Sequence, residues 1–165
     1  MTIRLERPED IAAIGAVTTA AFEGRPYSSQ TEALIVDALR AAGALSLSLV
    51  AQADDGEIVG HIAFSPVDIA ISAGDWYGLG PVSVAPGRQK EGHGQALIRE
   101  GLERLQAMGA AGCVLLGSPL YYARFGFETD EALTYGGEAS PYLQRLVFKG
   151  RPPRGSVTYH MAFGA

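Results

Sequence analysis

The sequence predicts a mixed α/β fold in a single domain that spans residues 1–165. Apolar residues first recur at helical spacing, then alternate with polar residues as in half-buried strands. A later helix lies between two strands, which is typical of a βαβ unit. A chain of 165 residues is long enough to bury its own core. No linker, repeat or low-complexity segment divides it, so we expect one domain.

The first part of the chain predicts a strand followed by two helices. Thr2 to Glu6 can form the strand, and Pro8 suits the first helical position before the apolar stripe of Ile11 to Phe22. The segment Ser29 to Glu32 matches a capping box at the start of the second helix. Gly43 can end that helix.

In the next part of the sequence apolar and polar residues alternate, which predicts strands. The alternation starts at Leu45 to Leu49, breaks at the hairpin signal Asp54-Asp55-Gly56, and continues from Ile58 to Ile71. Another strand is expected from Trp76 to Val84. It contains Pro81, which cannot donate to a ladder, so we expect a bulge or a local parting from a neighbouring strand there.

A helix and a buried strand follow. Gly94 to Met108 has helical periodicity, and its buried stripe is expected to be Ile98, Leu102, Leu105 and Met108. Cys113 to Leu116 is a continuous apolar run, as in a strand covered on both faces. The strands on either side of this helix should therefore be parallel, with a right-handed crossover.

The C-terminal part is harder to interpret. Pro119 to Arg124 fits a short helix, and Val157 to Phe163 alternates as a last strand. Residues from about Thr129 to Gly155 show no clear pattern.

Composition excludes some classes of function. The formal net charge is −5, which disfavours binding to nucleic-acid phosphates, and the apolar runs are too short to span a membrane. The N-terminus has no apolar segment typical of a secretory signal. The one cysteine, Cys113, cannot form an internal disulfide, so a reducing cytoplasm is the expected compartment.

The loop between the strand ending at Val84 and the following helix has the composition of an anion site. Gly92 and Gly94 suit positive φ angles or a close approach of the backbone to a ligand, and Arg88 and Lys90 add positive charge. Free N–H groups at the helix start would then surround a diphosphate. A plain strand-to-helix turn is the alternative. A Walker loop and a Rossmann fingerprint fit poorly, because their Gly-Lys-Ser/Thr and third glycine are absent.

At this point the chain resembles a known family. The run Val82 to Pro86, followed by Gln89-x-x-Gly92-x-Gly94, resembles the acetyl-CoA motif of GNAT N-acetyltransferases. Downstream, Tyr121 to Phe127 resembles the second signature of that family and its YhbS-type bacterial subgroup. The resemblance covers most of residues 1–127. It implies a GNAT-type acyl-CoA N-acyltransferase fold, with a central mixed sheet of six to seven strands flanked by helices, and with the fourth and fifth strands parallel and splayed.

The resemblance also implies a site. Acetyl-CoA would be the co-substrate, with no metal, and the backbone around Val82 to Val84 would bind the pantetheine arm and donate to the thioester carbonyl. Tyr122 would protonate the departing thiolate, although Tyr121 could take that role instead. His93 is expected to act through its backbone more than through its ring. The residues expected to bind the cofactor are Val82, Ser83, Val84, Gln89, Lys90, Glu91, Gly92, His93, Gly94 and Gln95.

The general base is left open. Many family members have a Glu on the fourth strand, but residues 76–85 contain no Asp, Glu or His. Ordered water, Glu23 or Asp68 could accept the proton, or the acceptor amine could have a low pKa. His61 lies on a strand without metal-ligand spacing to a partner, and Cys113 is expected in the core.

Two function classes besides the enzyme remain. One is a non-catalytic CoA or acyl-CoA sensor or partner-docking domain, and the other is a structural domain that binds no CoA. For the enzyme, the acceptor would be a primary amine of a small molecule or a protein, attacked directly in a ternary complex. Nucleic acid and membrane partners are not expected. A homodimer is plausible, because the C-terminal strands of this fold often pair between subunits.

Overall fold

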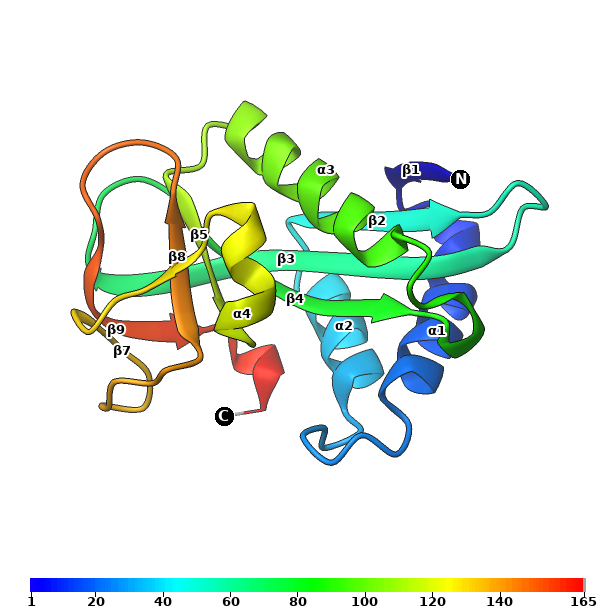
Figure 1. The fold of residues 1–165 in the computed structure, drawn as a ribbon, viewed down its shortest axis with the longest axis horizontal. Coiled ribbons are helices and arrows are strands. Elements are labelled where there is room, and N and C mark those ends of the chain that lie inside the picture. The colour runs from blue at the N-terminus through cyan, green and yellow to red at the C-terminus, as the bar shows by residue number, and fades with distance from the viewer. Residues whose placement is uncertain (165) are drawn as a thin grey trace. The chain divides into compact units, whose positions relative to one another are not determined.

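The computed structural model describes residues 1–164 (Figure 1). The expected elements follow in order along the chain, and three further strands occur between residues 128 and 147. These residues form two compact units, which we describe separately. Unit 1 comprises Met1–Phe64, Gly80–Gly101 and the residues from Met161 onward. Unit 2 comprises Ser65–Leu79 and Leu102–His160. The expectation of a single domain stays a prediction. No helix of residues 1–164 has the length and apolar character needed to cross a membrane.

Unit 1 combines three N-terminal strands with helices. Strand β1 pairs antiparallel with β2 from Thr2↔Gln52 to Leu5↔Leu49. Strand β2 pairs antiparallel with β3 from Leu47↔Phe64 to Val50↔His61 and beyond. The elements are β1 (Thr2–Leu5), α1 (Ile11–Phe22), α2 (Glu32–Ala41), β2 (Leu47–Gln52), and parts of β3 (Ile58–Ile71), β4 (Trp76–Val84) and α3 (His93–Ala107).

The core of unit 1 lies on two faces of β3. Helices α1 and α2 lie side by side (Figure 1). Their Ile14 and Val36 form a cluster with Val50 and Ala63. Because side chains alternate along a strand, the residues on either side of Ala63 point the other way. On that second face Gly101 of α3 approaches the ring of Phe64 closely.

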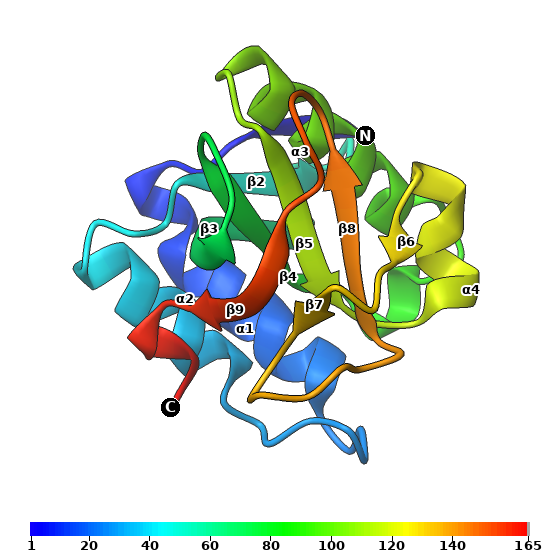
Figure 2. The same cartoon turned by 90° about the vertical axis from the view of Figure 1, so that its left-hand side faces the viewer.

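Unit 2 is built around β5. Within this unit the strands β4, β5, β8 and β6 are neighbours in that order, and β9 pairs with β3 and β7. Figure 2 shows β5 and β8 side by side, and their antiparallel register runs from Gly112↔Val147 to Leu116↔Leu143. The elements added here are β5 (Gly112–Leu116), α4 (Pro119–Tyr122), β6 (Glu128–Thr129), β7 (Leu133–Thr134), β8 (Leu143–Val147) and β9 (Arg154–Tyr159).

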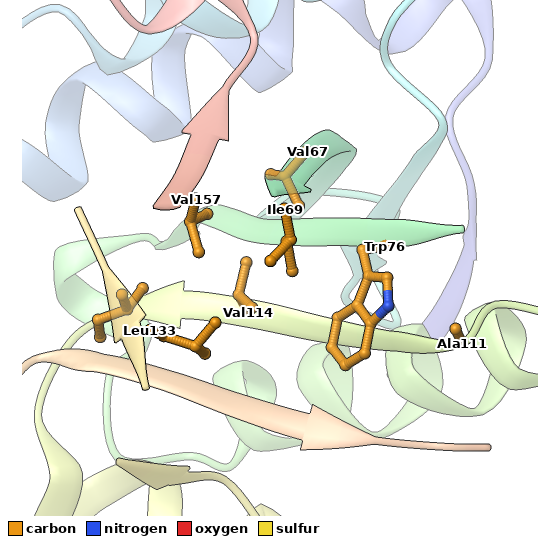
Figure 3. Packing of buried hydrophobic residues seen from close by; sticks show 8 residues of the cluster. Val67, Ile69, Trp76, Ala111, Val114, Leu133 and Val157 are labelled. Carbon is orange, nitrogen blue, oxygen red and sulfur yellow. The ribbon is translucent and has the colours of Figure 1, made fainter. Parts of the chain in front are cut away.

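The core of unit 2 is an apolar cluster around Trp76 (Figure 3). The indole is 3% exposed, and its Nε1 donates to the carbonyl of Ala73 at 3.3 Å. Figure 3 shows side chains from several strands in this cluster. Its buried members are Val67, Ile69, Trp76, Ala111, Val114, Leu133, Leu143 and Val157.

The splayed pair of parallel strands is confirmed. Strands β4 and β5 pair in parallel from Trp76↔Gly112 to Gly78↔Val114. The ladder ends there, although β4 continues to Val84. The local parting expected near Pro81 is therefore present, and the Gly80–Pro81 peptide bond is cis. Backbone groups of β4 beyond Gly78 are therefore outside the β5 ladder. The hand of the crossover stays a prediction.

Two expectations about helices were wrong. Helix α3 ends at Ala107, so Met108 lies beyond it and is 52% exposed, whereas Leu97 is fully buried. The capping box at Ser29 is absent, because Gln30 has a φ of 62° and reverses the chain before the helix. The hydroxyl of Ser28 donates to Glu32 at 2.7 Å instead.

The last strand is shorter than expected. Strand β9 ends at Tyr159, and Met161–Phe163 is a 3-10 turn. Tyr159 pairs with Val67, so the next position on β3 is Pro66. Because proline has no N–H to donate, the ladder cannot continue past that residue.

Candidate active site

The loop between β4 and α3 has the backbone geometry of an anion site. Two of its residues have positive φ, Lys90 at 67° and Gly92 at 89°. When residues with negative and positive φ angles follow one another, their successive N–H groups turn toward one concave face. A Cβ on Gly92 would meet no heavy atom within 4 Å, so the φ angle, and not crowding by the protein, favours glycine here.

The start of α3 adds further donors. The N–H of Ala96 bonds the carbonyl of Gly92 at 3.0 Å, which is the first bond of the helical series. The N–H groups of His93, Gly94 and Gln95 precede that bond, and the structure of residues 1–164 gives them no backbone acceptor. The 15-residue helix also directs the positive end of its dipole to this point. The loop can therefore hold a diphosphate.

The ring of His93 fixes the loop, which the sequence analysis missed. His93 is 7% exposed, its Nε2 donates to Glu91 Oε1 at 2.9 Å, and its Nδ1 lies 2.7 Å from the sulfur of Met1. The ring of His93 thus has a structural role in the loop, and the expectation that its backbone matters more for the ligand stays a prediction. Methionine and histidine are ninety-two positions apart, so no local pattern could have indicated this contact.

The charges of the loop are partly neutralised. Arg88 lies 3.3 Å from a carboxylate oxygen of Glu57 and 3.8 Å from one of Glu91. Lys90 is exposed. The side chain of Gln89 reaches back to the carbonyl of Val84 at 3.5 Å. The positive charge nearest to a bound anion would thus come from Lys90 and the helix dipole more than from Arg88.

The end of β4 leads directly into this loop. Val82 and Val84 are half-buried, whereas Ser83 is 1% exposed. Its Oγ has no hydrogen-bond partner within the described chain. The N–H of Ala85 donates to the carbonyl of Val59 at 2.8 Å and ties the strand end to β3. Unit 1 thus brings together all ten residues expected to bind the cofactor.

Tyr122 lies in unit 2, at the end of α4. Its ring centroid is 4.9 Å from that of Tyr121, 6.0 Å from Phe125 and 6.1 Å from Phe127. A Cβ on Gly117 would lie 2.7 Å from the Tyr122 ring. The missing side chain of Gly117 therefore leaves room for the edge of this ring. The guanidinium of Arg124 lies 4.5 Å from the Tyr121 ring. Both tyrosine rings are thus packed, and the choice of Tyr122 over Tyr121 as the acid stays a prediction.

The other candidates differ in their surroundings. Glu23, after α1, and Asp68, on β3, are both exposed. Cys113 is fully buried, and burial raises the pKa of its thiol well above the usual range, as expected of a core residue. Within residues 1–164, no group of three or more His, Cys, Asp or Glu side chains is arranged to bind a metal ion.

Comparison with protein families identifies the class. Residues 2–129 match the acetyltransferase (GNAT) domain model, in agreement with the loop and the splayed strands. The chain therefore belongs to the GNAT acetyltransferase family, whose members are acetyl-CoA-dependent N-acyltransferases.

Individual relatives agree with this assignment. The uncharacterized N-acetyltransferase YhbS of Escherichia coli K12 is 41% identical over 128 residues, which are 78% of this chain and 74% of that protein. The crystal structure of Escherichia coli YhbS in complex with CoA has a TM-score of 0.89 and 35% identity, and covers 99% of this chain and 92% of that one. The crystal structure of a GNAT family acetyltransferase from Brucella melitensis in complex with acetyl-CoA has a TM-score of 0.87 and 56% identity. The match covers 98% of this chain and 97% of that one.

Proposed function

We propose that this protein transfers the acetyl group of acetyl-CoA to a primary amine by direct attack in a ternary complex. The observation that supports this most is the loop from Gln89 to Gln95, where two positive φ angles precede the unpaired N–H groups of α3. A diphosphate at this point would place the pantetheine arm along Val82, Ser83 and Val84. The acetyl-CoA complex of the Brucella melitensis relative supports the same donor.

A direct attack fits the nucleophiles that the chain offers. A covalent acetyl-enzyme needs an accessible nucleophile with a suitable pKa. Cys113 is the only cysteine, it is fully buried, and burial raises the pKa of its thiol. It is therefore unsuited to receive the acetyl group, and the amine itself is the expected attacking group.

The thiolate of CoA leaves as the amide forms, and we assign its protonation to Tyr122. A phenol has an ordinary pKa of about 10, which is close to that of a departing alkyl thiol. The packing of Tyr122 among aromatic rings restricts its orientation, which favours a fixed donor over a mobile one.

The acceptor is proposed as a class, a primary amine of a small molecule or of a protein. The net charge of −5 favours the approach of a cationic amine over that of a nucleic acid. The single cysteine suits a reducing compartment such as the cytoplasm. A homodimer formed through the C-terminal strands is part of the same proposal.

The decisive experiment measures thiol release from acetyl-CoA with a panel of amines. Small primary amines and a lysine-containing peptide are added separately, and one class should release free CoA. Varying both substrates should give intersecting initial-rate lines, because both must be bound before transfer. Parallel initial-rate lines would indicate a covalent acetyl-enzyme intermediate. If no amine caused release of free CoA, the proposal that the protein is an acetyltransferase would be refuted.

A Gly92→Asp variant is the matched control for the donor site. Its carboxylate adds negative charge at the proposed diphosphate position, and aspartate tolerates positive φ better than most residues. We expect calorimetry to show loss of CoA binding while the circular dichroism spectrum is retained. CoA binding by the wild type without turnover would favour the alternative, a non-catalytic CoA sensor.

A further inference from the structure

A network of hydrogen-bonded polar residues links α2, β2 and β3 to the segment after β1, and its members are half-buried at Glu6 and Arg40 and buried at Ser48 and His61. The guanidinium of Arg40, on α2, binds Glu6 through two bonds of 2.7 and 2.8 Å. The Ser48 hydroxyl, on β2, lies 2.7 Å from Glu6 Oε1 and 2.8 Å from Nε2 of His61, on β3. His61 is 0% exposed. These residues lie far apart in the sequence, and only the strand register brings them together.

The hydrogen bonds among Arg40, Glu6, Ser48 and His61 determine which of these atoms carry protons. Burial raises the pKa of Glu6, but the hydrogen bonds from Arg40 and Ser48 together outweigh it and lower the pKa, so the resting carboxylate is ionised and accepts both bonds. Ser48 has one hydrogen, which it donates to Glu6. The Ser48 oxygen must then accept from His61, so Nε2 bears the proton. In a neutral imidazole the other nitrogen, Nδ1, is left with a free lone pair.

The ring is neutral in the folded protein. Burial lowers the pKa of His61 to about 4, Glu6 opposes this shift, and Arg40 adds to it. Helix α1 covers this face with Ile14, Val17 and Thr18 as its buried residues, none of which is ionisable. The hydroxyl of Ser83 is the polar group that β4 contributes. Nδ1 is therefore unprotonated near neutral pH.

The strand register places His61 beside Ser83 of β4. The bond from Ala85 N–H to the Val59 carbonyl pairs these two residues across β4 and β3. Two residues further along each strand, His61 lies opposite Ser83, and opposed residues of a pair point to the same face. His61 Nδ1 and Ser83 Oγ are both buried, and neither has a hydrogen-bond partner within the described chain. Polar atoms in this situation are commonly bridged by a bound water.

We propose that His61 is the proton acceptor of the acetyl transfer, and that it takes the proton of the amine at Nδ1 through a water bound to Ser83. This inference rests on the proposed function, which places the thioester along Val82 to Val84. His61 on β3 would supply the basic group that residues 76–85 of β4 lack.

The proton of the amine would pass through the water, His61, Ser48 and Glu6 to solvent. As the amine nitrogen bonds the acetyl carbon, its N–H bond breaks, the water gains that proton and passes one of its own to Nδ1. Nε2 passes its proton to Ser48, and Ser48 passes its own to Glu6. The Glu6 carboxylate lines a surface cavity of about 320 Å³ together with Arg40 and Ser48, which gives the proton a path to solvent. Exchange with solvent between turnovers restores the starting tautomer.

A weak base suffices for this step. The amine attacks in its uncharged form, and its nitrogen becomes positively charged as its lone pair bonds the acetyl carbon. An N–H on that nitrogen is far more acidic than one on a free ammonium. The proton therefore leaves readily late in the attack, when an imidazole of low pKa can accept it. Because the imidazole passes on a proton as it receives one, no buried imidazolium has to persist.

The test is a His61→Gln variant, whose side-chain amide keeps a donor for Ser48 but has no basic nitrogen. We expect kcat to fall about 100-fold while the acceptor KM and the affinity for CoA stay within about twofold. A Thr18→Val variant is the control, because it removes another buried hydroxyl from unit 1 and should leave kcat unchanged. A kcat of His61→Gln within about threefold of the wild type would overturn the proposal.

A measurement on the wild type keeps the inference testable if the variant does not fold. The ¹⁵N NMR signals of the His61 ring should show a protonated Nε2 and a bare Nδ1 at neutral pH. A protonated Nδ1 at that pH would overturn the proposal. If wild-type protein releases no thiol with any amine, the proposed function fails, whereas turnover with an unaffected His61→Gln variant refutes only the role of His61.

Discussion

At the residue scale, two tyrosines on α4 have different environments. Tyr121 lies under the guanidinium of Arg124, whereas Tyr122 contacts Phe125 and Phe127 and lies against Gly117. The ring of Tyr122 would keep this packing without its hydroxyl. The chemical role of the phenol can therefore be separated from the packing of its ring.

A Tyr122→Phe variant should lower kcat about 100-fold, because the thiolate would leave without its proposed acid. The affinity for CoA should stay nearly constant, as measured by calorimetry beside the thiol-release assay. Tyr121→Phe is the matched variant and should keep its activity. The reverse outcome, with Tyr121→Phe inactive and Tyr122→Phe active, would exchange the two roles.

A second residue-scale feature ties β1 to the start of α1. Arg4 binds Asp10 through two bonds of 2.7 and 3.0 Å, and the N–H of Arg7 donates to the same carboxylate at 2.7 Å. The Arg4 hydrogen bond is the main cause that lowers the pKa of Asp10, and burial opposes it. A carboxyl whose pKa is lowered by folding stabilises the native state above its unfolded pKa, and this contribution disappears as the pH falls through the folded value.

We expect Asp10→Ala to lower the free energy of unfolding by about 2 kcal/mol at neutral pH, because it removes the carboxylate partner of Arg4, which keeps its bonds to Gln52 and Leu5. The difference from the wild type should narrow in acid below pH ~4, where Asp10 of the unfolded chain is protonated. Urea unfolding at several pH values measures this. Asp54→Ala is the control, since Asp54 is exposed and its ion pair with the N-terminus should contribute little. A pH-independent difference would contradict the assignment.

At the element scale, helix α3 has two functions in unit 1. Its start supplies N–H groups to the loop, and its first turns pack against β3 through Gly60 and Gly101. A Cβ on Gly60 would lie 3.0 Å from Leu97 of α3, and one on Gly101 would overlap the ring of Phe64. The absence of side chains at these positions sets how closely the helix approaches the sheet, and hence where its start lies.

A Gly101→Ala variant tests this packing. Alanine favours helix by about 1 kcal/mol over glycine, but the added methyl must displace the Phe64 ring, so we expect a net loss of about 1–3 kcal/mol. Gly15→Ala in α1 is the control, because a Cβ there meets no atom within 4 Å, and it should stabilise the protein slightly. Thermal unfolding of both variants measures the difference. Equal stabilisation of the two would show that α3 does not pack closely at Gly101.

At the scale of the whole molecule, the features that could be predicted from the sequence are those that depend on residues close together in the chain. The bounds of β4 and the loop before α3 follow from short-range patterns, and the motif residues of the loop are contiguous in the chain. The two-residue strands β6 and β7 lie in the segment without a pattern, since so few residues give no detectable period. The polar network from Glu6 to His61 could not be predicted, because it depends on the register of three strands.

The burial of Cys113 has a practical consequence for labelling chemistry. Since it is the only cysteine and is fully buried with a raised thiol pKa, alkylating and disulfide reagents should leave the native protein unmodified. Every thiol detected in the transfer assay would then be a CoA molecule, and turnover could be counted without a protein background. A cysteine placed at any exposed position would in turn be the single reactive site, so that a fluorophore or spin label can be attached there without first removing a native thiol.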